Sequence, residues 1–349
     1  MKDMMKALVV HAPGQYSIEQ VPIPKTPAGG LLVKVEACGL CGSDLRTLRN
    51  GHRKVTLPWI IGHELVGTIV EIGPQCQTKW TIGTRLAIGP LSYCGTCDFC
   101  VAGSYELCLN YREIAQAWQG GFADYIAIPE ECVRFGTIQP ISHDIDAATA
   151  TLTEPLSSCI HAQEKGNVGL GDIVVIMGSG AIGCLHVMLA QLHGAYKTIL
   201  IDVVEERLQL AQAFQPDEII NASRVDVVEE VQKVTQGKGA HVVITANPSP
   251  TAQVQAVQMA RKGGRILLFG GLPPNQSSPP IDMNIVHYNG LYLIGTTIFA
   301  PRHQQTALTL ITSGKINTKD LITCYPLSDF NKAVQLALDG KVLKEVFFP

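Results

Sequence analysis

The chain has 349 residues, of which 46% are hydrophobic and only 16% are charged, and its formal net charge at pH 7 is −3. Intrinsically disordered chains combine low hydrophobicity with high charge, so this composition excludes disorder. Acidic and basic residues are nearly balanced, so the composition does not favour binding to nucleic acid. The sequence has no run of about 18 apolar residues, so no membrane span is predicted. The length predicts about two domains.

The N-terminal part of the chain is rich in glycine and proline and contains short apolar runs. KALVV, LLVKVEA and LVGTIVEIG are typical of strands, and few windows favour a long helix. This half is therefore predicted to be a mostly β domain with extended loops. Its opening segment, MKDMMKALVV, has too short an apolar part for a secretory leader.

The pattern changes near Asp144, where a helix-favouring segment begins. Apolar strands then alternate with helical segments, as in GDIVVIMGSGAIG, CLHVMLAQLHG and KTILIDV, and AQVQAVQMARK predicts a further helix. This alternation predicts an α/β fold with a doubly wound parallel sheet. The closing segment LKEVFFP predicts a strand that returns to the first domain. We expect a catalytic domain of residues 1–153 and 296–349, and a Rossmann domain of residues 154–295.

A glycine motif opens the second half of the chain. Gly178, Gly180 and Gly183 form G-x-G-x-x-G directly after an apolar strand and before a helical segment. The first glycine allows a tight turn, the second lets the backbone approach a pyrophosphate, and the third lets the helix lie close to the strand. We predict that Gly178, Gly180, Ile182 and Gly183 bind a dinucleotide, with its anion at the helix N-terminus.

Asp202 ends the next predicted strand, nineteen residues after Gly183. An acidic side chain there accepts hydrogen bonds from the adenosine ribose and repels a 2′-phosphate, so the sequence favours NAD over NADP. The alternatives are a flavodoxin-like sheet without a ligand, or an ordinary helix N-cap at Asp202. Arg207 either covers the adenine or lies on a solvated helix face.

Four of the eleven cysteines fall within fifteen residues. Cys94, Cys97, Cys100 and Cys108 have the spacing C-x2-C-x2-C-x7-C. Four thiolates close a tetrahedral zinc site with no open position, so we predict a structural zinc lobe at about residues 90–110. An iron–sulfur cluster also begins with C-x2-C-x2-C, but its pattern continues with C-x3-C-P, which does not follow here.

A second candidate metal site combines three types of ligand. Cys41 lies in CGLCGSD, and His63 and Glu64 lie in GHELVG. Cysteine, histidine and carboxylate side chains all bind zinc, and three protein ligands with one water make a catalytic site. These three residues alone are a weak signal, because a histidine is more often an ordinary polar group than a ligand.

The order of the motifs along the chain adds to this signal. CGLCGSD, GHE-x2-G-x5-G, the four-cysteine lobe, TEPLSSCIHA and the later G-x-G-x-x-G follow one another. In this order, and over essentially the whole chain, the sequence resembles the zinc-dependent medium-chain dehydrogenases of the alcohol dehydrogenase superfamily, and most of all their polyol (sorbitol dehydrogenase-like) branch. The resemblance implies a GroES-like catalytic domain beside the Rossmann domain, and a homodimer or homotetramer.

The resemblance also implies roles for single residues. Cys41 and His63 match direct zinc ligands, and Glu64 matches a ligand or a close neighbour of the metal. Glu154, in TEPL, matches an acid that ligates the zinc or holds its water. It replaces a cysteine of the simple alcohol dehydrogenases, which argues for a polyol or sugar-like substrate. Ser43 matches the hydroxyl that takes the proton of the substrate.

Several basic residues follow the CGLCGSD motif in the sequence. Arg46 stands where the family often has a histidine that relays the proton, and arginine cannot deprotonate. The cluster of Arg46, Arg49, His52, Arg53 and Lys54 either binds a phosphate or carboxylate of the substrate or is a solvated loop.

We therefore predict a cytoplasmic, homo-oligomeric dehydrogenase that uses zinc and NAD to oxidise a secondary hydroxyl of a polyol or sugar alcohol to a ketone. Oxidation of a polyol phosphate or of L-threonine is the alternative among enzymes. A cofactor-binding protein that has lost catalysis is the alternative of another class. The expected partner is a small-molecule substrate, with neither nucleic acid nor a membrane.

Overall fold

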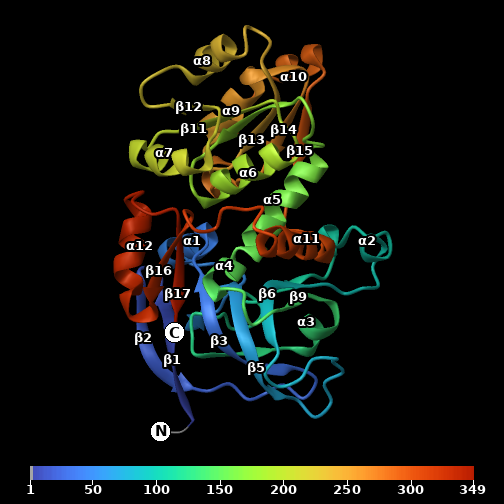
Figure 1. Cartoon of the computed structure of the whole chain (residues 1–349), viewed down its shortest axis with the longest axis vertical. Coiled ribbons are helices and arrows are strands. Elements are labelled where there is room, and N and C mark those ends of the chain that lie inside the picture. Colours follow the sequence, from blue (N-terminus) through green and yellow to red (C-terminus); the bar gives the residue numbers. More distant parts are fainter. Residues whose placement is uncertain (1–2) are drawn as a thin grey trace. The chain divides into compact units, whose positions relative to one another are not determined.

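The computed structural model describes residues 3–349. The chain divides into two compact units (Figure 1). Unit 1 contains the chain up to Ser157, Phe299–Asp339 and Lys344–Pro349, and unit 2 contains Ser158–Ile298 and Gly340–Leu343. Within the described residues, no helix is both long enough and apolar enough to cross a membrane.

Unit 1 is built on two sheets. The larger sheet has the order β16-β17-β3-β5-β6-β7, with β8 beside β3 and β9 beside β6, and the smaller one has the order β2-β1-β4. Its strands are β1 (Met4–Ala12), β2 (Gln15–Pro22), β3 (Leu31–Gly39), β4 (Trp59–Ile60), β5 (Glu64–Ile72), β6 (Arg85–Ser92), β7 (Arg112–Glu113), β8 (Tyr125–Ile128), β9 (Gly136–Ile141), β16 (Ile322–Pro326) and β17 (Lys344–Phe348). Among the strands of unit 1 within residues 3–349, β16 and β17 run parallel to each other, and the other neighbours are antiparallel.

Short helices connect and flank these strands. They are α1 (Gly42–Asn50), α2 (Asp98–Val101), α3 (Glu130–Phe135), α4 (Ala147–Thr151), α11 (Pro301–Thr312) and α12 (Phe330–Leu338), with 3-10 turns η1 (Tyr105–Leu107) and η4 (Leu327–Asp329). Helix α5 (Thr153–Lys165) begins in unit 1 and ends in unit 2. Helix α4 begins where the side chain of Asp146 accepts a hydrogen bond of 2.8 Å from the backbone N–H of Thr149, which satisfies a free helix donor.

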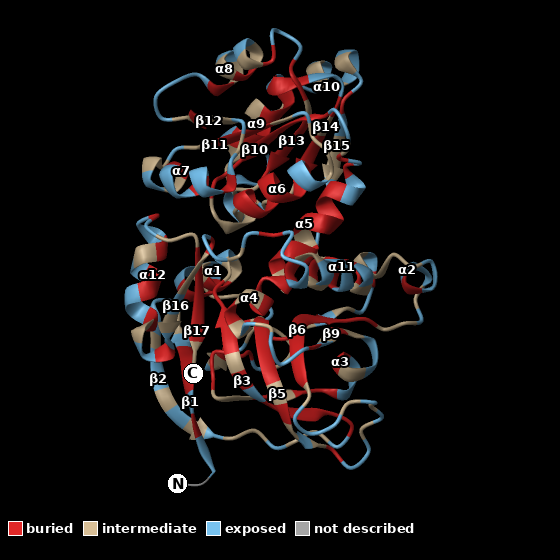
Figure 2. Cartoon of the chain, viewed as in Figure 1, coloured by how far each residue is buried: buried red, intermediate tan, exposed pale blue. Residues whose placement is uncertain are grey.

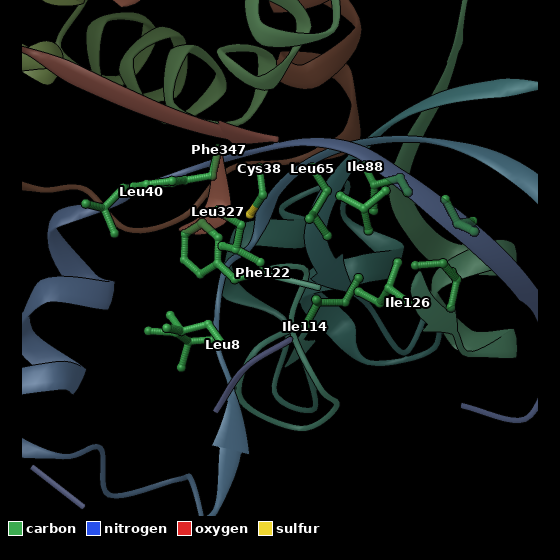
Figure 3. Close-up of a cluster of buried hydrophobic side chains, with 14 of the residues drawn as sticks. Leu8, Cys38, Leu40, Leu65, Ile88, Ile114, Phe122, Ile126, Leu327 and Phe347 are labelled. Carbon is green, nitrogen blue, oxygen red and sulfur yellow. The ribbon is translucent and has the colours of Figure 1, made fainter. Parts of the chain in front are cut away.

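The core of unit 1 joins the two ends of the sequence. Val346 and Phe347 of β17 pair with Gly39 and Cys38 of β3. The ring of Phe347 meets the ring of Phe122 edge-on, with centroids 5.6 Å apart. The sulfur of Cys38 lies in the same apolar cluster (Figure 3). The C-terminal strand is thus a central part of the sheet that carries the candidate metal ligands.

Unit 2 is one parallel sheet with the strand order β12-β11-β10-β13-β14-β15. This is the doubly wound order 3-2-1-4-5-6, in which dinucleotides bind at the carboxyl ends of the central strands. The strands are β10 (Ile173–Met177), β11 (Lys197–Asp202), β12 (Glu218–Asn221), β13 (Ala240–Thr245), β14 (Ala260–Leu268) and β15 (Tyr292–Gly295). Strand β10 is buried along its whole length, as a central parallel strand should be (Figure 2).

Helices cover this sheet. They are α6 (Ala181–Leu192), α7 (Glu205–Ala211), α8 (Val227–Val234), α9 (Pro250–Met259) and α10 (Met283–Asn289), with 3-10 turns η2 (Gln212–Phe214) and η3 (Pro274–Gln276). The predicted helix AQVQAVQMARK was too long. Helix α9 ends at Met259, because Ala260 already pairs with Ala240 of β13 as a strand residue.

Candidate metal and cofactor sites

Three of the predicted ligands meet in unit 1. The ligand atoms of Cys41, His63 and Glu64 all lie within 4.8 Å of one another. Cys41 is the N-cap of α1, two residues after the end of β3, and Glu64 is the first residue of β5. The antiparallel pairing of β3 with β5 sets Gly39 opposite Glu64. It thereby brings the end of one strand and the start of the other, which are distant in sequence, to one point.

Asp44 holds two of these ligands in place. Its Oδ1 lies 3.5 Å from Nδ1 of His63, and its Oδ2 accepts a hydrogen bond of 3.0 Å from the backbone N–H of Cys41. Burial lowers the pKa of His63, but the nearby Asp44 and Cys41 outweigh this and raise it well above its ordinary value. A carboxylate on one ring nitrogen fixes the ring and leaves Nε2 for a metal, an arrangement common among metal-binding histidines.

Lys344 supplies a buried cation beside Glu64. Its side chain is 4% exposed and forms an ion pair with Oε2 of Glu64, which is 1% exposed. The same ammonium donates a hydrogen bond of 2.8 Å to the carbonyl of Leu40, the residue before Cys41. Burying a carboxylate without a partner lowers the stability of the fold, and the ion pair with Lys344 compensates this cost for Glu64. Sequence reasoning missed Lys344, because a single lysine in an apolar strand matches no ligand pattern.

The donor set suits zinc. The buried Oε1 of Glu64 has no hydrogen-bond partner among residues 3–349. Buried polar atoms are rarely left unpaired, and those that are call for a ligand, ion or water. Thiolate sulfur, imidazole nitrogen and carboxylate oxygen are the atoms that zinc takes in catalytic sites. The residues present therefore fit a zinc ion at Cys41, His63 and Glu64.

Glu154 and Ser43 lie around this group. Glu154 is in the first turn of α5, outside the set of mutually close ligand atoms, but its carboxyl group interacts electrostatically with His63 and Glu64. Burial raises its pKa to about 8. Ser43 is partly buried in the first turn of α1, where its carbonyl accepts a hydrogen bond of 3.0 Å from Oγ1 of Thr47.

Glu113 is a further acidic residue at this site that the sequence did not reveal. The charge of His63 acts on its carboxyl group, and its own charge acts on Glu154. It follows the four-cysteine lobe in the sequence and belongs to none of the ligand motifs, so its spacing carried no signal. Asp44, in contrast, stands within CGLCGSD, three residues after Cys41, where an acid is also suited to cap a helix.

The structure brings the four clustered cysteines together as well. Cys94, Cys97, Cys100 and Cys108 form one group of close sulfur atoms. The sulfur of Cys94 lies 3.9 Å from that of Cys100 and 3.5 Å from that of Cys108. Tetrahedral zinc with bonds of about 2.3 Å separates its sulfurs by about 3.8 Å. Backbone N–H groups of Thr96 and Cys97 lower the pKa of Cys94 to about 5, which favours the thiolate.

The glycine turn of unit 2 has the geometry of a phosphate cradle. Gly178 has a φ of 115° and follows β10 directly. A Cβ on Gly183 would lie 1.7 Å from the carbonyl oxygen of Gly178, so only glycine lets α6 lie this close. Nothing lies within 4 Å of a Cβ built on Gly180, the N-cap of α6, so the backbone there is open to a pyrophosphate. Ile182, partly buried, lies in the first turn of the same helix.

Asp202 sits at the end of β11, but its carboxylate is already engaged. Oδ2 accepts hydrogen bonds from the backbone N–H (2.7 Å) and the hydroxyl (3.0 Å) of Ser179. Oδ1 accepts hydrogen bonds from the N–H groups of Val203 and Val204 at 2.7 and 3.0 Å. The side chain thus ties the glycine turn to the next loop. Arg207 is partly buried in α7 and lies against Gly340.

The basic residues of the 46–54 segment gather in space. Burial lowers the pKa of the partly buried His52, and the charges of the exposed residues Lys54, Arg53 and Arg46 lower it further. The Nζ of Lys54 lies 3.1 Å from the hydroxyl of Tyr111. Arg49 is also exposed.

A dinucleotide-type sheet in one unit and a thiolate–histidine–carboxylate group in the other define a metal-assisted, nicotinamide-dependent dehydrogenase. Comparisons with known proteins agree. Residues 27–135 match the model of the alcohol dehydrogenase GroES-like domain, and residues 181–313 match that of the zinc-binding dehydrogenase.

Relatives match over the full chain. The chain is 31% identical to a sorbitol dehydrogenase of Halalkalibacterium halodurans and 32% identical to an L-threonine 3-dehydrogenase of Pyrococcus horikoshii, with 99% of each chain covered in both cases. It also matches the crystal structure of a putative zinc-binding dehydrogenase of Sinorhizobium meliloti bound to NADP, with a TM-score of 0.88, 30% identity and 99% coverage of both chains. The chain belongs to the zinc-dependent alcohol dehydrogenase family, as the sequence motifs predicted.

Proposed function

We propose that the protein oxidises a secondary hydroxyl group of a polyol or sugar alcohol to a ketone, with NAD as the acceptor. In this proposal unit 1 is the catalytic domain and unit 2 binds the dinucleotide. The observation that carries this proposal is the close group of Cys41, His63 and Glu64. The Oε1 atom of Glu64 in this group is buried and has no hydrogen-bond partner among the described residues. A carboxylate at Glu154, in place of a second thiolate, suits a hydroxyl-rich substrate. Similarity to a sorbitol dehydrogenase over the whole chain supports the same substrate class.

The chain itself supplies orientation and a path for the proton. When bound, zinc is the Lewis acid for the substrate oxygen, and NAD accepts the hydride with its two electrons. Asp44 fixes the ring of His63, and Lys344 compensates the charge of Glu64. The hydroxyl of Ser43 takes the proton of the substrate hydroxyl and passes it towards solvent. Glu154 would bind the zinc or hold the water next to it.

The preference for NAD rests on Asp202. A carboxylate at the end of β11 disfavours a ribose 2′-phosphate because the two groups repel each other. Its four hydrogen bonds to the turn and the following loop keep its negative charge at this point. The ribose hydroxyls would replace some of these donors, and Arg207 would lie beside the adenosine.

The state of the protein in the cell belongs to the same proposal. Two thiolate-containing zinc sites suit a reducing compartment, so we place the protein in the cytoplasm. We also propose a homodimer or homotetramer, as the low content of charged residues favours a buried interface.

The test is the rate of NADH formation from NAD on a panel of neutral polyols, polyol phosphates and L-threonine. Cys41→Ser is compared with Cys76→Ser, a partly buried cysteine outside both metal groups. We expect turnover of neutral polyols that only Cys41→Ser abolishes. Turnover confined to phosphates or to threonine would replace the proposed substrate, and no turnover with NAD and zinc bound would contradict the enzyme assignment.

A further inference from the structure

The backbone around Glu113 is held on both sides. Strand β7 pairs with the end of β6, so that Glu113 lies opposite Leu91. The carbonyl of Glu113 accepts hydrogen bonds from the N–H groups of Gln116 (3.2 Å) and Ala117 (2.8 Å). A side chain on so fixed a backbone has a defined direction, which a specific contact with a ligand requires.

The two residues of β7 have opposite surroundings. Arg112 is exposed, forms an ion pair of 3.2 Å with Glu131 and stacks over the ring of Trp118. Glu113 is partly buried. Successive strand residues point to opposite faces, so Arg112 faces solvent and Glu113 faces the interior.

Only one of the two oxygens of the Glu113 carboxylate has a hydrogen-bond donor among residues 3–349. The side-chain amide of Gln116 donates a hydrogen bond to its Oε2. No group among residues 3–349 donates to its Oε1, and no cation there forms an ion pair with it. A carboxylate offers about four acceptor positions, so most of those on Oε1 are open. Oε1 is accessible from outside the chain, so a hydroxyl group of a ligand can take the place of water as its donor.

This open oxygen belongs to the neighbourhood of the metal ligands. His63 and Lys54 act electrostatically on Glu113, and Glu113 acts on Glu154. Lys54 does not neutralise it directly, because its Nζ is engaged by the hydroxyl and the ring of Tyr111, 3.1 Å from the oxygen and 4.7 Å from the ring centroid. The site therefore has an acceptor oriented by Gln116 and free to bind a donor on the substrate.

We infer that Glu113 is a specificity-determining residue, whose carboxylate accepts a hydrogen bond from a second hydroxyl group of the substrate, next to the one that is oxidised. This inference rests on the proposed polyol oxidation and names the feature that the site selects, a neighbouring pair of hydroxyl groups. A site built to bind a hydroxyl group rejects the analogue that lacks it, because its own polar atom is then left unpaired. Glu113 thus favours vicinal diols over mono-alcohols.

The experiment compares kcat and KM for butane-2,3-diol and butan-2-ol, which differ by one hydroxyl group. Variants Glu113→Gln and Glu113→Leu are tested beside Glu131→Gln, an exposed carboxylate that pairs with the neighbouring Arg112. In the wild type we expect kcat/KM for the diol to exceed that for the mono-alcohol by about tenfold to a hundredfold, the range for one hydrogen bond to a charged group. Glu113→Leu brings this ratio close to one, chiefly by raising KM for the diol, and Glu131→Gln leaves it unchanged.

Further results distinguish a failure of this inference from a failure of the proposed function. Glu113→Gln keeps the shape of the side chain and an acceptor oxygen, so its ratio falls between those of the wild type and Glu113→Leu. An unchanged ratio in both Glu113 variants, with wild-type zinc content, overturns this inference and leaves the proposed oxidation standing. A wild-type enzyme that oxidises no alcohol of the panel overturns the proposed function and this inference with it.

Discussion

The two candidate metal sites of unit 1 are built in opposite ways. The lobe draws its four ligands from one short stretch, Cys94 to Cys108, and the sulfurs are one another's neighbours. The open site takes Cys41 from the end of β3 and Glu64 from the start of β5, with Lys344 from the last strand. A closed set of four thiolates has no place for a substrate, whereas the open site leaves an oxygen of Glu64 unpaired.

The surroundings of the two sites differ as well. The lobe exposes apolar side chains, with Val101 77% and Leu109 71% accessible, so it has little core of its own. Such a segment depends on its metal for structure. The open site rests instead on a large buried sheet and on the charged partners Asp44 and Lys344. The contrast predicts that a bound metal stabilises the lobe, whereas the fold stabilises the open site.

Loss of a ligand at the open site should have the largest effect. Cys41→Ser is expected to lower kcat/KM by about a thousandfold, which corresponds to about 4 kcal/mol of transition-state stabilisation by the metal. Zinc analysis should show one ion fewer per chain, and the thermal midpoint should change little because the sheet remains. Retained activity with one zinc missing would refute the difference between the sites.

Loss of a ligand in the lobe should act on structure. Cys100→Ser is expected to open the lobe, so that proteolysis within residues 94–108 becomes about tenfold faster or more, since a locally unfolded segment is the one that is cleaved. Cys132→Ser, at a buried cysteine outside the lobe, is the matched control. Limited proteolysis followed by mass spectrometry measures the rate. Equal cleavage of both variants would show that the lobe does not depend on its cysteine cluster.

The buried ion pair of the open site gives the next effect. In the metal-free protein, Lys344→Met leaves the carboxylate of Glu64 buried without a cation, which costs roughly 3–5 kcal/mol of unfolding free energy. Arg134→Met removes an exposed partner of Glu130, at 52% and 51% exposure, and should cost only about 0.3–0.5 kcal/mol. Urea unfolding of both variants measures the difference. Similar losses in the two would mean that burial does not set the value of the pair.

A pH dependence of the metal-free protein is the last prediction. Burial raises the pKa of Glu154 from 4.5 to about 8, so between these values the folded protein keeps a proton that the unfolded chain releases. The free energy of unfolding then falls as pH rises, by up to about 1.4 kcal/mol per pH unit. Glu154→Gln should remove this slope between pH 5 and 8 in urea unfolding of the chelated protein. A slope common to both proteins would assign it to other groups.

Local spacing explains what the sequence predicted well. The cysteines of the lobe and the glycines around Gly178 lie within one loop or turn, and the alternation of strands and helices indicated the doubly wound sheet. Lys344 escaped prediction because it is 304 residues from Leu40, to which it donates. Such a partner emerges only when β17 has joined β3. The roles assigned to Ser43 and Glu154 remain predictions.

The most direct test of the account is to remove zinc in steps with a chelator and to measure metal content, NADH formation from a polyol and thermal stability at each step. We predict two zinc ions per chain at the start. The first to leave should abolish NADH formation with little loss of stability, and the second should open the lobe. Full activity after the first ion has left, or loss of the lobe before loss of activity, would contradict the division into an open catalytic site and a closed structural one.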